Sequence, residues 1–88
     1  MKEAELGKIF ADFKDITAFY EVKRVLEFVV YEDEYRLEVL YDSSNPGTPW
    51  TGRMYKAAGL GWEAVHQDAI TNEKSEESVI RWALSLLG

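Results

Sequence analysis

The sequence contains no cysteine and no apolar run long enough to span a membrane, and it has a single histidine. The two absences argue against a disulfide-bonded protein and against a membrane-spanning one. Without cysteine there are no disulfides, no thiolate metal sites and no cysteine nucleophile, which fits a reducing compartment. The first residues, Met1-Lys2-Glu3-Ala4-Glu5, are charged where a signal peptide would turn apolar. We therefore expect a soluble protein of the cytoplasm, either of the cell that produces it or of its host, with no membrane partner.

The length and composition indicate one small folded domain spanning residues 1–88. A chain of 88 residues buries only about 60–65% of its unfolded surface, which leaves little room for a deep catalytic cavity. Four Phe, five Tyr and three Trp favour a packed core over disorder, although the net charge is −6.

Residues 16–42 are the stretch around which the chain is organised. From Ile16 to Val30 apolar side chains recur at every second position, which is typical of a strand with one apolar face. After the acidic triplet Glu32-Asp33-Glu34 the apolar side chains take the other parity, at Leu37, Val39 and Tyr41. Both runs are rich in β-branched and aromatic residues, so we expect a long antiparallel hairpin with its apolar side toward a core.

The N-terminal residues 2–13 carry a helical stripe instead. Its apolar members lie at i, i+3, i+4 and i+7: Leu6, Ile9, Phe10 and Phe13. This spacing predicts a short amphipathic helix. Ile16, Phe19, Tyr20 and Lys23 also fit helical spacing, so a helix running past Asp15 is an alternative, but the β-branched and aromatic residues after Thr17 favour a strand.

The next segments read as a loop, a strand and a second hairpin. Residues 42–49 are loop-like, with a β-turn expected at Pro46-Gly47, where glycine would supply a positive φ. Residues 50–58 read as a third strand, in which Gly52 indicates a bulge or a close approach of backbone. Gly59-Leu60-Gly61 is a second turn, and a short fourth strand is expected from Trp62 to about His66, although residues 62–70 also fit loop or helix.

A C-terminal helix follows Ser75, a good N-cap, with Glu76 and Glu77 in the first turn where carboxylates favour the helix dipole. Its apolar stripe consists of Val79, Ile80, Ala83, Leu84 and Leu87, flanked by Trp82 and Leu86. We expect an α+β fold of two layers: an N-terminal helix, a three- to four-stranded antiparallel sheet with a long first hairpin, and this helix packed on the sheet beside the first one.

The residue types that carry catalysis or metal binding are sparse. His66 with Asp68 could form half of an acid–base pair, but no serine or cysteine nucleophile motif accompanies them, and a histidine with no catalytic role is the favoured interpretation. The triplet at 32–34 lacks the alternating ligand spacing of a calcium loop, so a solvated hairpin tip is favoured over a metal site. We therefore expect no enzyme, no cofactor and no metal.

The expected order of helix, three strands and helix is similar to that of double-stranded RNA-binding domains. Such a domain presents lysines at the start of its last helix to contact phosphates, whereas this chain has Ser75-Glu76-Glu77 there and an acidic sheet. The resemblance is one of element order alone, and the acidic residues predict that the protein does not bind nucleic acid directly.

The charge distribution predicts a protein partner instead. Residues 15–42 carry eight acidic and three basic residues, so the hairpin holds nearly all of the net negative charge. Small, acidic, cysteine-free α/β chains of this size resemble inhibitors encoded by phages and mobile elements, some of which imitate the charge of DNA. The leading hypothesis is therefore a binding protein that docks on a basic, nucleic-acid-handling protein. The candidate docking residues are Glu27, Glu32, Asp33, Glu34, Glu38 and Asp42, with Tyr35 and Trp50 as candidate anchors.

Two alternatives belong to other classes. The long first strand could pair with its counterpart in a second copy, making a homodimer with a structural or regulatory role. The weakest alternative is a small enzyme that uses His66 with Asp68 or with the acidic turn.

Overall fold

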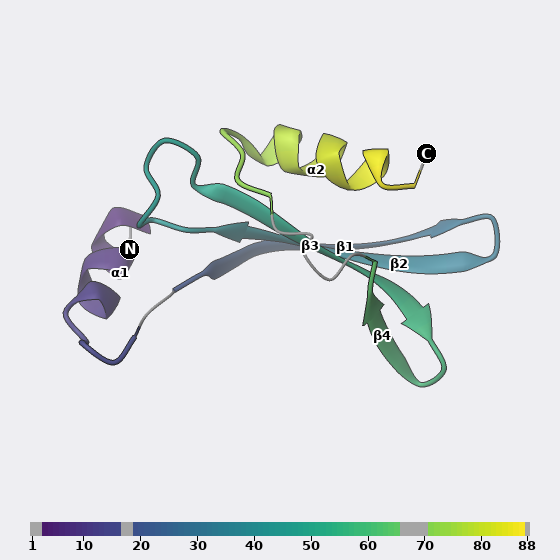
Figure 1. The fold of residues 1–88 in the computed structure, drawn as a ribbon, viewed down its shortest axis with the longest axis horizontal. Helices are drawn as coiled ribbons and strands as arrows, with labels where there is room; N and C mark the ends of the chain where they lie inside the picture. Colours follow the sequence, from purple (N-terminus) through teal and green to yellow (C-terminus); the bar gives the residue numbers. More distant parts are fainter. Residues whose placement is uncertain (1–2, 17–18, 66–70, 88) are drawn as a thin grey trace.

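The chain folds into a four-stranded antiparallel sheet with a helix at each end of the sequence, as the composition and periodicity predicted (Figure 1). The computed structural model describes residues 3–16, 19–65 and 71–87. Its elements are α1 (Glu3–Ala11), β1 (Glu21–Val30), β2 (Asp33–Tyr41), β3 (Trp50–Ala58), β4 (Gly61–Ala64) and α2 (Glu76–Ser85). The prediction of an α+β fold with a long first hairpin and a C-terminal helix packed on the sheet is confirmed.

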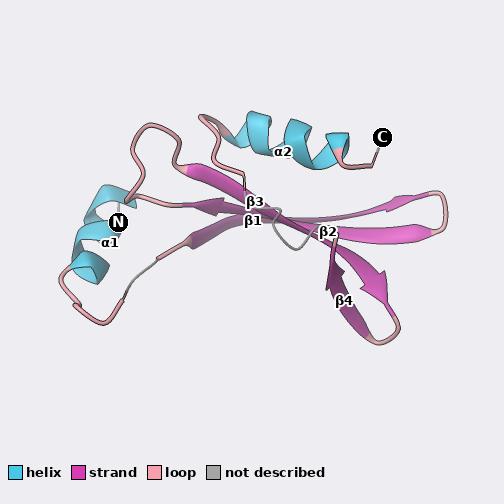
Figure 2. Ribbon diagram, viewed as in Figure 1, coloured by secondary structure: helices cyan, strands magenta, loops and turns pink. Residues whose placement is uncertain are grey.

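The sheet is a simple meander in which each strand pairs with the next one along the chain (Figure 2). The order β1-β2-β3-β4 leaves β1 and β4 at the two edges of the described sheet. The helix α2 lies across one face of the sheet and packs on β3 and β2. We call this side the helix face and the other side the open face.

Strand β1 begins at Glu21, so the prediction that it begins at Ile16 is wrong. Glu21 pairs with Tyr41, the last residue of β2, and the chain turns into a loop at Asp42. A strand can extend only as far as its partner supplies backbone hydrogen bonds. The helical alternative is wrong as well, because α1 ends at Ala11 and turns follow it.

A β-bulge divides β1 and changes which side chains face the core. The register shifts between Val22 and Arg24, so Lys23 is the extra residue. Beyond the bulge Leu26 and Phe28 pack against the core, as the alternation predicted. Before the bulge the prediction fails, because Val22 is paired with Leu40, away from the core cluster, and is 51% exposed.

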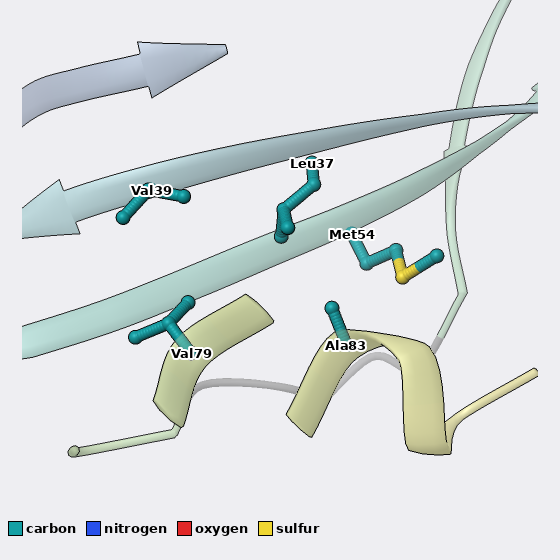
Figure 3. Close-up of a cluster of buried hydrophobic side chains, with 5 residues drawn as sticks. All are labelled: Leu37, Val39, Met54, Val79 and Ala83. Carbon is teal, nitrogen blue, oxygen red and sulfur yellow. The ribbon is translucent and has the colours of Figure 1, made fainter. Parts of the chain in front are cut away.

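The core lies between α2 and the centre of the sheet (Figure 3). Its fully buried members come from β2, β3 and α2: Leu37, Val39, Met54, Val79 and Ala83. Gly52 lets the helix approach closely, because a Cβ on this residue would lie 2.6 Å from Val79 Cγ1 and 3.1 Å from the Trp82 ring. The predicted bulge is absent, because the β2–β3 register is regular through the Val39–Gly52 pair. A close approach does occur at Gly52, but side chains of α2 make it rather than backbone.

Helix α2 begins as predicted at the cap residue Ser75. The Ser75 side chain accepts a hydrogen bond from the backbone N–H of Ser78 at 3.1 Å. Val79 and Ala83 are buried against the sheet, whereas Leu84, which the periodicity placed on the same stripe, is 52% exposed. Helix α2 packs on β3 and β2, and Leu84 lies on the side of the helix that faces β1, where no strand covers it.

Helix α1 does not lie beside α2, and the prediction that the two helices share the sheet is wrong (Figure 1). Among the described elements α1 contacts no strand and not α2. Its apolar side chain Ile9 is 53% exposed. Phe13, which the periodicity placed in the helix, follows its end at Ala11 and is 66% exposed. The centre of the helix face is already covered by α2, and the ring of Phe10 stacks instead on Phe19 in the connection to β1, with centroids 4.0 Å apart.

The loop from Asp42 to Pro49 contains the expected turn at Pro46-Gly47. The Thr48 N–H donates to the Asn45 carbonyl at 3.2 Å, which closes the turn. The positive φ expected at Gly47 is absent, and among the described glycines only Gly59 has one, at 59°. Gly59 opens the β3–β4 hairpin, where the predicted second turn is confirmed. The predicted fourth strand is present as β4, from Gly61 to Ala64, and its expected end at His66 lies outside the described residues.

Candidate interaction surface

The acidic triplet forms the tip of the β1–β2 hairpin, which projects beyond the C-terminal end of α2 (Figure 1). Glu32, Asp33 and Glu34 are all exposed. Asp33 lies 3.5 Å from the Lys56 ammonium group on β3, a pair in which both side chains are about half exposed. Glu32 and Glu34 have no ion pair with any described residue. Two carboxylates thus face solvent at the end of an extended arm.

Tyr31 precedes this triplet and was not among the residues singled out from the sequence. It occupies the two-residue turn between the paired residues Val30 and Asp33, with φ of 57° and an exposed fraction of 98%. A left-handed conformation costs a residue with a side chain roughly 1–2 kcal/mol. Tight hairpins usually place Asn or Gly there. The only sequence signal was an aromatic residue at the centre of a hairpin that lacks such a turn residue.

Glu27 and Glu38 come together on the open face, on either side of Arg36. The Arg36 guanidinium donates to the Glu27 carboxylate at 3.0 Å and lies 3.8 Å from that of Glu38. Ion pairs this exposed contribute about 0–1 kcal/mol each. These pairs matter more for the charge of the surface than for stability. Arg36 offsets part of the negative charge of Glu27 and Glu38 on the open face.

Asp42 lies at the opposite end of β2 from the acidic tip. It lies nine positions after Asp33, just beyond the end of β2, which at the rise of an extended strand is about 30 Å. Its carboxylate accepts the backbone N–H of Ser44 at 2.9 Å and so orders the first turn of the loop. The structure therefore does not bring Asp42 together with Glu32, Asp33 and Glu34 in one patch.

The two candidate anchors are half-buried and pack against the core. Tyr35 stacks on Phe28 with ring centroids 5.8 Å apart. The rings of Trp50 and Tyr41 are nearly perpendicular with centroids 5.1 Å apart. The backbone of Trp50 exchanges hydrogen bonds with that of Glu73 at 3.1 and 2.6 Å. Both rings thus contribute to the core on the helix face, at opposite ends of the sheet.

The described residues contain no group of three or more His, Asp or Glu side chains arranged to hold a metal ion. His66 and Asp68, the candidate acid–base pair, lie outside the described residues. No helix among the described residues is long and apolar enough to cross a membrane.

Comparison with known proteins adds no relative. The chain matches no protein-family model, no curated protein and no solved structure.

Proposed function

We propose that this protein is a small, non-enzymatic binding protein whose acidic hairpin tip docks on a basic site of another protein. The observation that supports this most is the pair of carboxylates, Glu32 and Glu34, exposed at the end of a projecting arm without a described cationic partner. Internal ion pairs hold Glu27 and Glu38. The tip therefore offers more unbalanced charge than the face of the sheet.

Long-range attraction would drive the encounter. The net charge of −6 attracts a cationic surface over roughly a Debye length, about 8 Å at physiological ionic strength. Such charges act mainly on the association rate and on partner choice. Binding should therefore weaken as salt is added.

Tyr31 would supply most of the binding affinity, because the charges act mainly on the association rate. Tyrosine is enriched among the few interface residues that contribute most of the affinity, and a ring is worth most when the complex desolvates it fully. At 98% exposure the Tyr31 ring has almost its whole area available. Acidic groups beside an exposed ring fit a basic site that contains an apolar depression.

The partner we propose is a protein that handles nucleic acid, because such proteins carry clustered Lys and Arg side chains that contact phosphates. A protein bound there would block nucleic acid by occupying its site, which is the action of an inhibitor. The size, the acidity and the absence of cysteine are in keeping with inhibitors of phage or mobile-element origin.

A pair of charge-reversed variants tests this function. The first combines Glu32→Lys, Asp33→Lys and Glu34→Lys at the tip. The matched control combines Glu5→Lys, Asp12→Lys and Asp15→Lys, which are exposed and change the net charge by the same amount. Tagged wild type and both variants are used to capture proteins from source or host lysate at low and high salt, followed by mass spectrometry.

The expected result is a basic protein retained by the wild type and the control at low salt and lost by the tip variant. Equal loss in both variants would show that net charge alone governs binding and would overturn a docking site at the tip. A partner unaffected by both variants and by salt would overturn the electrostatic mechanism.

A further inference from the structure

The two edges of the sheet differ in how they are protected. Strand β4 is short, and the backbone of Trp50 on β3 is paired with Glu73, which covers part of the remaining edge on that side. Strand β1 is longer, from Glu21 to Val30, and no described strand pairs with its outer side. Proteins usually shorten, charge or cover such an edge, because unpaired backbone groups recruit another strand.

Beyond the bulge, β1 has apolar side chains on both faces. Val25 and Val29 point to the open face and are 42% and 63% exposed. Leu26 and Phe28 point to the helix face, only partly buried. The two charged residues of this stretch are already paired within the chain, Arg24 with Glu76 and Glu27 with Arg36. This half of the edge is therefore close to neutral and apolar.

A groove runs beside β1 on the helix face. Helix α2 packs on β3 and β2, and between it and β1 lies an open groove of about 530 Å³. Its apolar lining comes from Leu26, Ile80 and Leu84, and ion pairs form its rim. Leu84 is exposed because it faces this open groove instead of a strand.

We propose that a second copy of this chain covers this edge and groove, with β1 pairing antiparallel to its counterpart about a two-fold axis at Glu27. The sequence Val25-Leu26-Glu27-Phe28-Val29 is self-complementary in this register. Val25 lies opposite Val29 of the second copy, and Leu26 lies opposite Phe28, so like faces meet. The two sheets become one, and both α2 helices lie on the same side of it.

The charges of β1 are compatible with the same arrangement. Residues 21–24 carry one acidic and two basic side chains, Glu21, Lys23 and Arg24, whereas Glu32 and Asp33 follow Tyr31 after the end of the strand. Antiparallel pairing brings the net-positive start of each strand toward the acidic end of the other, twice in a symmetric dimer, with Glu21 opposite Asp33 as the one pair of like charges there. At the axis the two Glu27 carboxylates lie between two Arg36 side chains, each already 3.0 Å from its own Glu27.

Cysteine substitutions read this register directly, since the chain contains no cysteine of its own. In the proposed dimer Glu27→Cys places two thiols opposite each other at the axis, within the range of a disulfide. Val25→Cys and Val29→Cys alone place equivalent thiols four residues apart across the pair, about 13 Å. Leu60→Cys, on the fully exposed β3–β4 turn, controls for collisions in solution.

Under mild oxidation Glu27→Cys should cross-link at least about tenfold faster than Leu60→Cys, and a mixture of Val25→Cys and Val29→Cys should give the mixed dimer. Fastest cross-linking of Val25→Cys alone would place the axis elsewhere and overturn this register. Equal rates at all positions would overturn the pairing itself.

Light scattering of the unsubstituted protein provides the second measurement. The expected result is a dimer that Val29→Lys dissociates, with a dimer dissociation constant raised at least about tenfold, roughly 1.4 kcal/mol. Val29 is 63% exposed, so circular dichroism should show an intact fold. A wild type that stays monomeric at millimolar concentration would overturn the proposal. Neither measurement depends on the partner proposed for the acidic tip.

Discussion

The two helices have the same kind of amphipathic pattern, but only one of them buries its apolar face. Helix α2 buries Val79 and Ala83 completely against the sheet, whereas Ile9 of α1, and Phe13 just after its end, are more than half exposed. The difference lies in what each stripe meets. Gly52 on the sheet leaves room for the side chains of α2, whereas the ring contact described for α1 is the stack of Phe10 on Phe19. An amphipathic period shows that a helix has an apolar face, and it does not show what covers that face.

The comparison extends to how firmly each helix is formed. Helix α2 has a side-chain N-cap and two carboxylates in its first turn, and its buried face holds it on the sheet. Isolated helices shorter than about 12–15 residues are marginal in water. With nine residues and no contact to another described element, α1 depends on its own backbone and on the Phe10–Phe19 stack. Substitutions should therefore affect the two helices very differently.

The largest effect on the free energy of unfolding is expected from the core residues of the sheet that pack against α2. Leu37→Ala removes a side chain that is 1% exposed and should lower the free energy of unfolding by about 2–5 kcal/mol, the usual cost of a cavity in a core. Urea denaturation measures this. The matched control is Leu84→Ala on α2 itself, the same change at a side chain 52% exposed, for which we expect a much smaller cost. Equal costs would contradict the position assigned to the core.

The next effect comes from the close approach at Gly52. Gly52→Ala places a methyl group 2.6 Å from Val79 Cγ1 and should cost about 1–3 kcal/mol, as overpacking does. Gly61→Ala is the control, because a Cβ there meets nothing within 4 Å.

A double variant sharpens this test. Val79→Ala removes the atom that clashes, so Gly52→Ala should cost less in the Val79→Ala background than in the wild type. Strict additivity of the two costs would show that α2 does not press on Gly52.

A smaller effect is expected at the start of α2. Ser75→Ala removes the acceptor of the Ser78 N–H and should cost about 1 kcal/mol. For a domain of this size that corresponds to a fall in melting temperature of about 4–8 °C. Ser75→Asp retains an acceptor and should keep most of the stability, and an equally large loss in that variant would argue against a capping role.

The smallest effect is expected on the α1 side. Phe13→Ser alters a ring that is 66% exposed and should change the free energy of unfolding by less than about 0.5 kcal/mol. Hydrogen exchange offers an independent check, because the α1 amides should exchange by local opening, long before those of α2 and β2. A loss of about 2 kcal/mol for Phe13→Ser would mean that the N-terminal segment around the end of α1 packs on the rest of the fold after all.

Part of the candidate site could be predicted from the sequence, and part depends on contacts between strands. The acidic triplet was identifiable as a hairpin tip, because the apolar alternation changes parity on either side of it. The offset of Glu27 and Glu38 by Arg36 depends on cross-strand pairing, and so does the separation of Asp42 from the tip. Tyr31 escaped prediction because its significance comes from the full exposure of its ring at the turn, and neither that exposure nor a positive φ can be read from the residue type when it is not glycine or asparagine.

The local pattern of the sequence determined the elements of this protein: a hairpin with an acidic turn, a third strand that contains a glycine, a capped C-terminal helix and a short N-terminal one. These follow from nearest-neighbour preferences and from the periods of helix and strand. Only the tertiary structure decided where β1 begins, since its partner ends at Tyr41, and which side of β1 faces the core before the bulge at Lys23. It also decided that α2 rather than α1 covers the sheet. Pairing and packing depend on residues far apart in the chain, and a window of sequence does not contain both partners of a contact.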